Sequence, residues 1–176
     1  MPQNNEKIVV IGFGWVGQAN ALSLRLMGYD VSVYDPGDPE HHYDHPDEYE
    51  SISRLKDPLQ NDSENTWYIV TVGDRVSEDG VQDISLIRSA LDSLKQAKGK
   101  TILRSTILPE KLGSLDFDIY FPEFLHEKFA VQECLEPYLF VVGIREDIRF
   151  PSFLDEWSKR SYKVFRGTPE EASYIK

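Results

Sequence analysis

The sequence has little positive charge, a single cysteine and no long apolar run. Its 19 Lys and Arg residues stand against 30 Asp and Glu, for a net charge of −11, which argues against nucleic acid or an anionic membrane as the main partner. The one cysteine, Cys134, excludes an internal disulfide and fits a reducing compartment. Residues 1–7 are polar, and no apolar run approaches the roughly 20 residues that a membrane helix needs. Together these features favour a cytoplasmic protein.

The most informative stretch runs from Lys7 to Asp35. A β-branched run at 8–11 leads directly into Gly-Phe-Gly-Trp-Val-Gly at 12–17, then an apolar helix-forming run, then a second β-branched run that ends at the acid. This order of strand, glycine turn, helix, strand and acid is the fingerprint of dinucleotide binding. The turn residues expected to contact the cofactor are Gly12, Phe13, Gly14, Trp15, Val16 and Gly17. The alternative is an ordinary strand-to-helix turn that binds nothing.

Each glycine of this turn has a separate expected role. Gly12 allows a tight turn out of the strand, Gly14 lets a pyrophosphate approach the backbone, and Gly17 lets the helix pack closely. Asp35 is placed to accept hydrogen bonds from the adenosine ribose hydroxyls, and its charge would repel a 2′-phosphate. No Arg or Lys follows it before Arg54, so the sequence favours NAD over NADP.

Strands and helices alternate along the rest of the chain. We expect strands at 67–72, 100–104, 117–121, 138–142 and 162–165, and helices at 51–57, 84–97 and 147–159. This alternation predicts an α/β fold, in which residues 1–176 form a single Rossmann-like domain with a doubly wound, mainly parallel sheet.

Residues 36–50 are rich in proline and acidic residues, and we expect a mobile loop there. His41, His42 and His45 occur close to two aspartates in this segment, but without the regular spacing of a helical or finger-type metal site. A solvated loop is therefore the preferred interpretation, and no metal is expected.

Ligands of doubly wound folds bind outside the carboxyl ends of the strands. The segments expected in this shared crevice, besides the glycine turn and Asp35, are Val72, Gly73, Asp74, Ser105, Thr106 and residues 122–127.

Four of these segments match one known pattern. They are the opening at 7–17, Tyr-Ile-Val-Thr-Val-Gly at 68–73, Ser-Thr-Ile-Leu-Pro at 105–109 and Pro-Glu-Phe-Leu-His-Glu at 122–127. Together they resemble the N-terminal NAD-binding domain of the UDP-glucose/GDP-mannose dehydrogenase family. The last segment is the most specific, because it matches that family's Pro-Glu-Phe-Leu-x-Glu signature, and the resemblance spans essentially the whole chain.

The resemblance implies an NAD-binding half of an enzyme that oxidises a sugar nucleotide's primary alcohol to a carboxylate with two NAD+, the aldehyde being held by a cysteine. It implies that Thr106 lies at the reacting sugar, that Glu123 is the general base for thioester hydrolysis, and that Lys176 stabilises an oxyanion. It also implies that Glu127 lies near the nicotinamide end of the cofactor. The other cofactor contacts predicted beyond the glycine turn, from the strand ends, are Asp35, Val72, Gly73, Asp74, Ser105 and Thr106. Substrate would contact Glu123 and the backbone around Phe124 and Leu125.

The sequence also departs from the family. The central dimer-forming helix and the C-terminal sugar-nucleotide domain are absent from these residues, and so is the Gly-Gly-x-Cys motif of the catalytic cysteine. Cys134 lies where the family has no nucleophile, so we expect a small, partly buried thiol there. Asp74 and Arg75 replace a Thr-Pro pair, and Lys128 replaces a glycine after the signature.

Three hypotheses follow. In the first, the chain is the cofactor half of a nucleotide-sugar dehydrogenase, either a fragment or one piece of a split enzyme whose partner chain supplies the missing half. In the second, it is a stand-alone module that binds NAD or a nucleotide sugar without catalysis. In the third, it is an unrelated Rossmann oxidoreductase. The Pro-Glu-Phe-Leu-x-Glu match disfavours the third. We expect a sugar-nucleotide substrate for the first and no activity from this chain alone.

Overall fold

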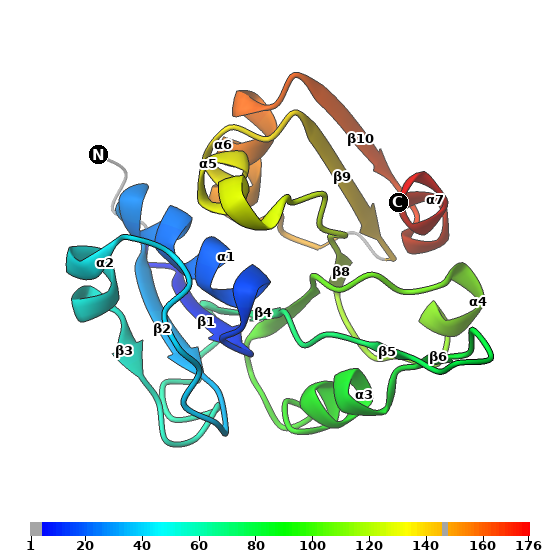
Figure 1. Cartoon of the computed structure of the whole chain (residues 1–176), viewed down its shortest axis with the longest axis horizontal. Helices are drawn as coiled ribbons and strands as arrows, with labels where there is room; N and C mark the ends of the chain where they lie inside the picture. Colours follow the sequence, from blue (N-terminus) through cyan, green and yellow to red (C-terminus); the bar gives the residue numbers. More distant parts are fainter. Residues whose placement is uncertain (1–4, 146–147) are drawn as a thin grey trace.

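A computed structural model describes residues 5–145 and 148–176, which are organised around one large sheet (Figure 1). The strands are β1 (Lys7–Ile11), β2 (Asp30–Tyr34), β3 (Ser53–Arg54), β4 (Thr66–Val70), β5 (Arg75–Val76), β6 (Gln82–Asp83), β7 (Lys100–Leu103), β8 (Ile119–Tyr120), β9 (Leu139–Ile144) and β10 (Lys163–Gly167). The helices are α1 (Trp15–Leu26), α2 (Pro46–Ser51), α3 (Ser85–Asp92), α4 (Pro109–Leu112), the 3₁₀ helix η1 (Glu127–Phe129), α5 (Ala130–Leu135), α6 (Ser152–Arg160) and α7 (Pro169–Ile175).

The main sheet has eight strands in the order β10-β9-β8-β7-β4-β1-β2-β3. Neighbouring strands are parallel except for β8 and β9, which are antiparallel. The predicted α/β class with a mainly parallel, doubly wound sheet is therefore confirmed. Because β3, β2, β1, β4, β7 and β8 run in the same direction, their carboxyl ends share one edge, and the chain order reverses between β1 and β4. Ligands of such sheets bind at this reversal.

Two hydrophobic cores cover the two faces of the sheet. Successive residues of β1 alternate between them, with Ile8 and Val10 in one core and Val9 and Ile11 in the other. The first core packs under α1, α5 and α6, where Trp157 is fully buried. The second packs against α3, α4 and α7, and Figure 1 shows α3 across the sheet from α1. These layers leave the strand ends free to form a site.

Helix α7 brings the end of the chain back to the sheet edge formed by the carboxyl ends of the parallel strands. It begins with a capping box, in which the Thr168 hydroxyl and the Glu171 carboxylate each accept a backbone hydrogen bond. Its start packs on β9 so closely that a Cβ on Gly143 would lie 2.4 Å from the Cα of Pro169. From there the helix runs back beside β8, and Lys176 at its end reaches the segment that follows β8.

Several predicted elements differ from those observed. The predicted helix at 51–57 is wrong. The helix begins earlier, at Pro46, because proline and the two acids that follow favour a first turn. Residues 53–54 form a strand that pairs with β2. Helix 84–97 ends at Asp92, and strand 117–121 is reduced to Ile119–Tyr120. Asp147, the predicted start of a helix, lies outside the described residues; that helix, α6, starts at Ser152. Within the described ranges, no helix has the length and apolar character needed to cross a membrane.

Candidate functional site

The glycine turn between β1 and α1 is built by backbone geometry. Gly12 has φ +89°, a left-handed conformation that favours glycine. A Cβ on Gly17 would lie 2.1 Å from the Gly12 carbonyl oxygen, so only glycine allows α1 to start this close to the turn. A Cβ on Gly14 would meet nothing within 4 Å. Gly12 and Gly17 are thus required by the fold, whereas Gly14 faces open space.

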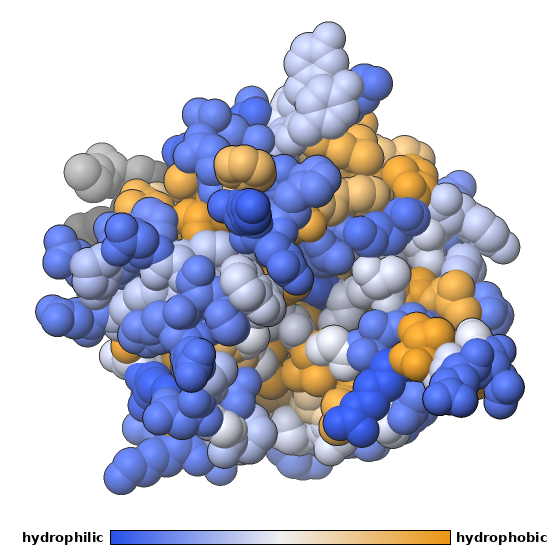
Figure 2. Space-filling model, viewed as in Figure 1, coloured by the Kyte–Doolittle hydropathy of each residue, from blue (hydrophilic) through white to orange (hydrophobic). Residues whose placement is uncertain are grey.

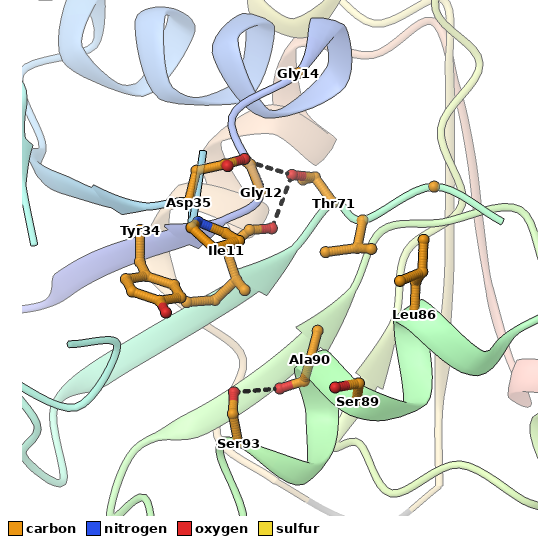
Figure 3. A pocket seen from close by; sticks show the side chains of 13 residues that line it. Ile11, Gly12, Gly14, Tyr34, Asp35, Thr71, Leu86, Ser89, Ala90 and Ser93 are labelled. Carbon is orange, nitrogen blue, oxygen red and sulfur yellow. Dashed lines mark hydrogen bonds between the residues drawn. The ribbon is translucent and has the colours of Figure 1, made fainter. Parts of the chain in front are cut away.

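Thr71, which directly follows β4, holds this turn from the neighbouring strand. Its hydroxyl lies 3.0 Å from the Ile11 carbonyl oxygen and 2.9 Å from that of Gly12, and can donate to either (Figure 3). The same hydroxyl would be 2.8 Å from a Cβ on Gly17. Sequence reasoning missed this residue, because nothing local distinguishes it from any other strand-end threonine.

The start of α1 has no side-chain cap. Gly14 is the N-cap, and the first intrahelical bond there runs from Gln18 N to Gly14 O at 2.9 Å. The backbone N–H groups of the first turn and the positive end of the helix dipole are therefore available for an anion. Trp15, at the first helical position, stacks face to face on His42 with ring centroids 4.0 Å apart.

Asp35 lies at the end of β2, beside the glycine turn. One carboxylate oxygen accepts from Phe13 N at 2.7 Å and the other from Gly37 N at 2.7 Å. These bonds fix the carboxylate, and each oxygen keeps lone-pair capacity for a ligand hydroxyl. Phe13 was predicted to contact the cofactor, but its side chain is buried in the core and its N–H is engaged by Asp35. The Phe13 N–H therefore helps to fix the acid.

A pocket of about 470 Å³ opens between the glycine turn and α3. We call it the glycine-turn pocket; its lining consists of Ile11, Gly12, Gly14, Tyr34, Asp35, Pro36, Thr71, Val72, Gly73, Leu86, Ser89, Ala90 and Ser93. Figure 2 shows hydrophobic side chains exposed at this hollow, below the centre of the view. Its walls are mostly apolar, with one fixed carboxylate at the rim, which suits a flat aromatic ring attached to a polyol.

The α3 wall of this pocket escaped sequence reasoning, although a signal was present. Leu86, Ala90 and Ser93 recur at helical spacing and face the glycine turn (Figure 3). A neighbouring face of the helix carries Ile87 and Leu91, which are buried in the core. A helix with one large apolar stripe and a second stripe of mostly small residues can bury the first and present the second to a ligand.

Across the strand ends, hydrogen bonds join the pocket to the segments after β7 and β8. Ser105, predicted as a cofactor contact, donates its hydroxyl proton to Val72 O at 2.6 Å. Thr106 is exposed, and its carbonyl accepts from the Gln82 side chain at 2.9 Å. Gln82 also donates to the Asp74 carboxylate at 2.6 Å. Of these groups, the Thr106 hydroxyl and the Asp74 carboxylate are available to a ligand.

Glu123 and Lys176, two predicted site residues that are far apart in the sequence, form an ion pair in the structure. Their charged groups lie 3.3 Å apart, and the side chains are 19% and 23% exposed. Lys176 Nζ also lies 5.0 Å from the centre of the Phe124 ring. The other Glu123 oxygen accepts from Leu125 N at 2.9 Å, which fixes the carboxylate in the turn. An acid and a cation thus stand paired at the crevice edge.

A buried arginine lies beneath this pair. Arg104 is 5% exposed, and its guanidinium stacks 3.9 Å from the centre of the Phe121 ring. One guanidinium nitrogen lies 3.4 Å from the carbonyl oxygens of both Phe121 and Pro122. Burial lowers the pKa of Arg104, while Cys134 and Glu123 oppose that shift. Arg104 therefore anchors the segment that carries Glu123.

Glu127 lies apart from this arrangement, whereas Cys134 lies beside Arg104. Glu127 belongs to η1 and lines a separate, open hollow with Phe129. Cys134 was expected to be partly buried; it is 1% exposed, with its sulfur 3.9 Å from an Arg104 nitrogen. Burial raises the pKa of the Cys134 thiol even though Arg104 acts in the opposite direction.

The segment at 36–50, expected to be a mobile loop, packs against the glycine turn and α1. Its main link is the buried side chain of Gln18, which donates to Phe13 O and Glu40 O and accepts from His42 N. His41 stacks on Tyr49 with ring centroids 3.7 Å apart. Two of the three histidines therefore face aromatic rings. The part of the chain described by the structure contains no group of three metal-ligating side chains.

The comparisons with known proteins bear on the fold. Neither protein-family models nor curated proteins match the sequence. Solved structures do match. The GDP-mannose dehydrogenase of Pseudomonas aeruginosa superposes with a TM-score of 0.78 at 19% identity, over 96% of this chain and 48% of that one. The UDP-glucose dehydrogenase of Pyrobaculum islandicum gives 0.80 at 22% identity, over 99% and 49%.

The 3-hydroxyisobutyrate dehydrogenase of Mycobacterium tuberculosis, solved with L-serine, also matches, with a lower TM-score of 0.66 at 17% identity, over 97% of this chain and 57% of that one. The chain spans about half the length of the first two proteins. At identities this low the superpositions establish the fold alone. The fold is the one expected from the resemblance seen in the sequence.

Proposed function

We propose that this chain binds NAD and forms the cofactor half of a nucleotide-sugar 6-dehydrogenase. The observation that carries this proposal is the glycine-turn pocket: an open helix start at Gly14, a carboxylate fixed at Asp35 and an apolar wall from α3. Adenine would lie against that wall, the ribose hydroxyls would donate to Asp35, and the phosphates would accept from the first turn of α1.

Preference for NAD rests on charge at the ribose. A 2′-phosphate would lie beside the Asp35 carboxylate, which repels it. Arg54 is distant in sequence, but β3 brings it to the loop after Asp35, where it pairs with Asp38 and donates to Gly37 O at 2.8 Å. Because Arg54 is already engaged, we expect NADP to bind more weakly than NAD.

The reaction would occur at the other end of the crevice, where bound NAD+ supplies the hydride acceptor. Lys176 would present its positive charge to an oxyanion, and Glu123, 3.3 Å away, would take a proton from water. Thr106 would orient the sugar. The Glu123–Lys176 contact supports these roles, because the resemblance placed both residues at the same reacting centre.

Oxidation also needs a thiol to hold the aldehyde, and Cys134 is buried. We therefore infer that the sugar is oxidised only when a further segment or a partner chain supplies that group. The competing function is a non-catalytic module that binds NAD or a nucleotide sugar. The two differ in whether Glu123 and Lys176 matter to any reaction once a thiol-bearing half is present.

The first test is calorimetric titration of the chain with NAD+ and with NADP+. We expect NAD+ to bind, NADP+ to bind at least about tenfold more weakly, and Gly14→Val to bind NAD+ at least about tenfold more weakly. The matched control is Gly113→Val, because Gly113 at the end of α4 also has nothing within 4 Å of a Cβ. Wild-type protein that does not bind NAD+ would refute the proposal.

If NADP+ binds as tightly as NAD+, Arg54→Met separates two causes. Loss of NADP+ binding alone would assign the 2′-phosphate to Arg54 and overturn the proposed preference for NAD. An unchanged ratio would mean that Asp35 does not approach the ribose.

A further inference from the structure

A carboxylate that the dehydrogenase resemblance does not explain lies between the glycine-turn pocket and Thr106. Asp74 follows Gly73, the last pocket residue on the β4 side, and is partly exposed. Gln82, on β6, donates to one of its oxygens at 2.6 Å. Among the described residues no salt bridge to Asp74 is found, so its charge has no cationic partner there.

Gln82 can fix this carboxylate because both ends of its own side-chain amide are held by hydrogen bonds. Both donations come from the same nitrogen, to Asp74 at 2.6 Å and to Thr106 O at 2.9 Å. Its amide oxygen accepts from Leu108 N at 3.1 Å, and the residue is only 7% exposed. Gln82 thereby ties the segment after β4 to the segment after β7. Asp74 is held in place, with its second oxygen available as an acceptor.

The topology indicates what would meet that oxygen. A dinucleotide crosses the sheet edge where the strand order reverses, here between β1 and β4, and its second half extends over the ends of β4 and β7. Asp74 lies at the end of β4, and Gln82 links it to Thr106 at the end of β7. The part of the ligand that passes there is the sugar on the far side of the phosphates. Its hydroxyl groups are donors, which a fixed carboxylate accepts well.

We propose that Asp74, positioned by Gln82, binds the hydroxyl groups of the nicotinamide-side ribose. The inference rests on the proposed NAD binding and deepens it. It makes Asp74 a binding residue, Gln82 a positioning residue, and this pair a second ribose site that complements Asp35.

Electrostatics supplies the competing case, because an acid close to a pyrophosphate repels it. The two cases predict changes of opposite sign. If Asp74 binds the ribose, its removal weakens ligands that carry the second ribose. If it only repels phosphate, its removal tightens every ligand that carries the diphosphate, including ADP.

The experiment is calorimetric titration of the whole chain with NAD+, ADP-ribose and ADP, for wild type and Asp74→Ala. We expect Asp74→Ala to weaken NAD+ and ADP-ribose by about tenfold or more, because a hydrogen bond to a charged group is lost. ADP, which has no second ribose, should bind as in wild type or slightly more tightly. Asp79→Ala, in the turn of the antiparallel hairpin that β5 and β6 form directly after Asp74, removes the same charge at an exposed position and should leave all three ligands unchanged.

Gln82→Met tests the positioning role. It keeps the length of the side chain and removes both donations, so we expect the same selective loss for NAD+ and ADP-ribose with a smaller factor. A uniform loss for all three ligands would instead mean a general disturbance of the fold and would contradict the positioning role.

The outcomes separate this inference from the proposed function. If wild type does not bind NAD+, the proposed function fails and the ribose site fails with it. If wild type binds NAD+ and Asp74→Ala binds it equally or more tightly, NAD binding stands and the ribose site is overturned.

Discussion

At the glycine-turn pocket the groups open to an anion are backbone N–H groups at the start of α1, whereas at the Glu123–Lys176 pair the charged groups are the tips of side chains. The pocket's geometry follows from the positive φ of Gly12, from the close approach of Gly17 to the Gly12 carbonyl, and from the Thr71 hydroxyl, which lies 3.0 and 2.9 Å from the carbonyl oxygens of the turn. The pair depends on one contact of 3.3 Å between two partly exposed groups. The first region is complete within this chain. The second has its charged groups at an open edge, where another segment would be needed to enclose a substrate.

This difference gives the first prediction, which concerns stability. Gly17→Ala places a Cβ against the Gly12 carbonyl, a backbone atom that cannot rotate away, so we expect a loss of about 3 kcal/mol or more in the free energy of unfolding. Urea unfolding followed by circular dichroism measures it. Gly113→Ala, at a glycine with open space around it, should change stability by less than about 0.5 kcal/mol. Equal stabilities for the two variants would show that the turn is less closely packed than described.

The second prediction concerns the thiol of Cys134, which lies beside Arg104. Cys134 is buried and its pKa is raised by burial, so at pH 8 little of it is the reactive thiolate. We expect a disulfide reagent to label it at least about a hundredfold more slowly in the native protein than in urea, as measured by absorbance. Comparable rates in the two states would mean that the thiol reaches solvent and could take part in the chemistry.

The third prediction tests how the glycine turn is held. Thr71→Val keeps the shape of the side chain and removes the hydroxyl that bonds to the turn, so we expect a loss of about 1 kcal/mol in stability and several-fold weaker NAD+ binding. Thr71→Ser retains the hydroxyl and should preserve NAD+ affinity. Equally weak binding by both variants would mean that the methyl group, not the hydroxyl, is what matters.

Parts of this molecule could be predicted from sequence because their signals are local. The glycine turn, the end of β2 at Asp35 and the alternation that predicts a parallel sheet all lie within short windows. The shared fold with known dehydrogenases followed from motifs of the same kind. The helix at 51–57 was wrong, because the proline at 46 begins a helix earlier and pairing with β2 then extends the chain.

The residues that hold the site together could not be predicted in the same way. Gln18, Thr71 and Gln82 each join segments that are distant in sequence, and each contact depends on strand register and hairpin position. In sequence, each of these is an ordinary polar residue on a helix or near a strand end. Arg104 likewise gains its role only when β8 brings Phe121 beside it. The small-residue face of α3 is different, because its helical spacing was visible beforehand.

We expect the smallest changes in stability and in NAD+ affinity from substitutions at the Glu123–Lys176 pair. These variants test most directly whether the pair and the glycine-turn pocket are separate regions. Lys176→Met removes an ion pair between partly exposed groups, so we expect a stability loss of no more than about 1 kcal/mol. NAD+ affinity should stay unchanged. In the part of the chain that the structure describes, no hydrogen bond or ion pair joins this pair to a residue that lines the glycine-turn pocket. Glu123→Gln serves as the matched change on the other partner, and calorimetry on both variants measures the affinity. If either variant weakens NAD+ binding as much as Thr71→Val does, the pair is part of the cofactor site, and the division of the crevice into a complete binding region and an open reaction region has to be given up.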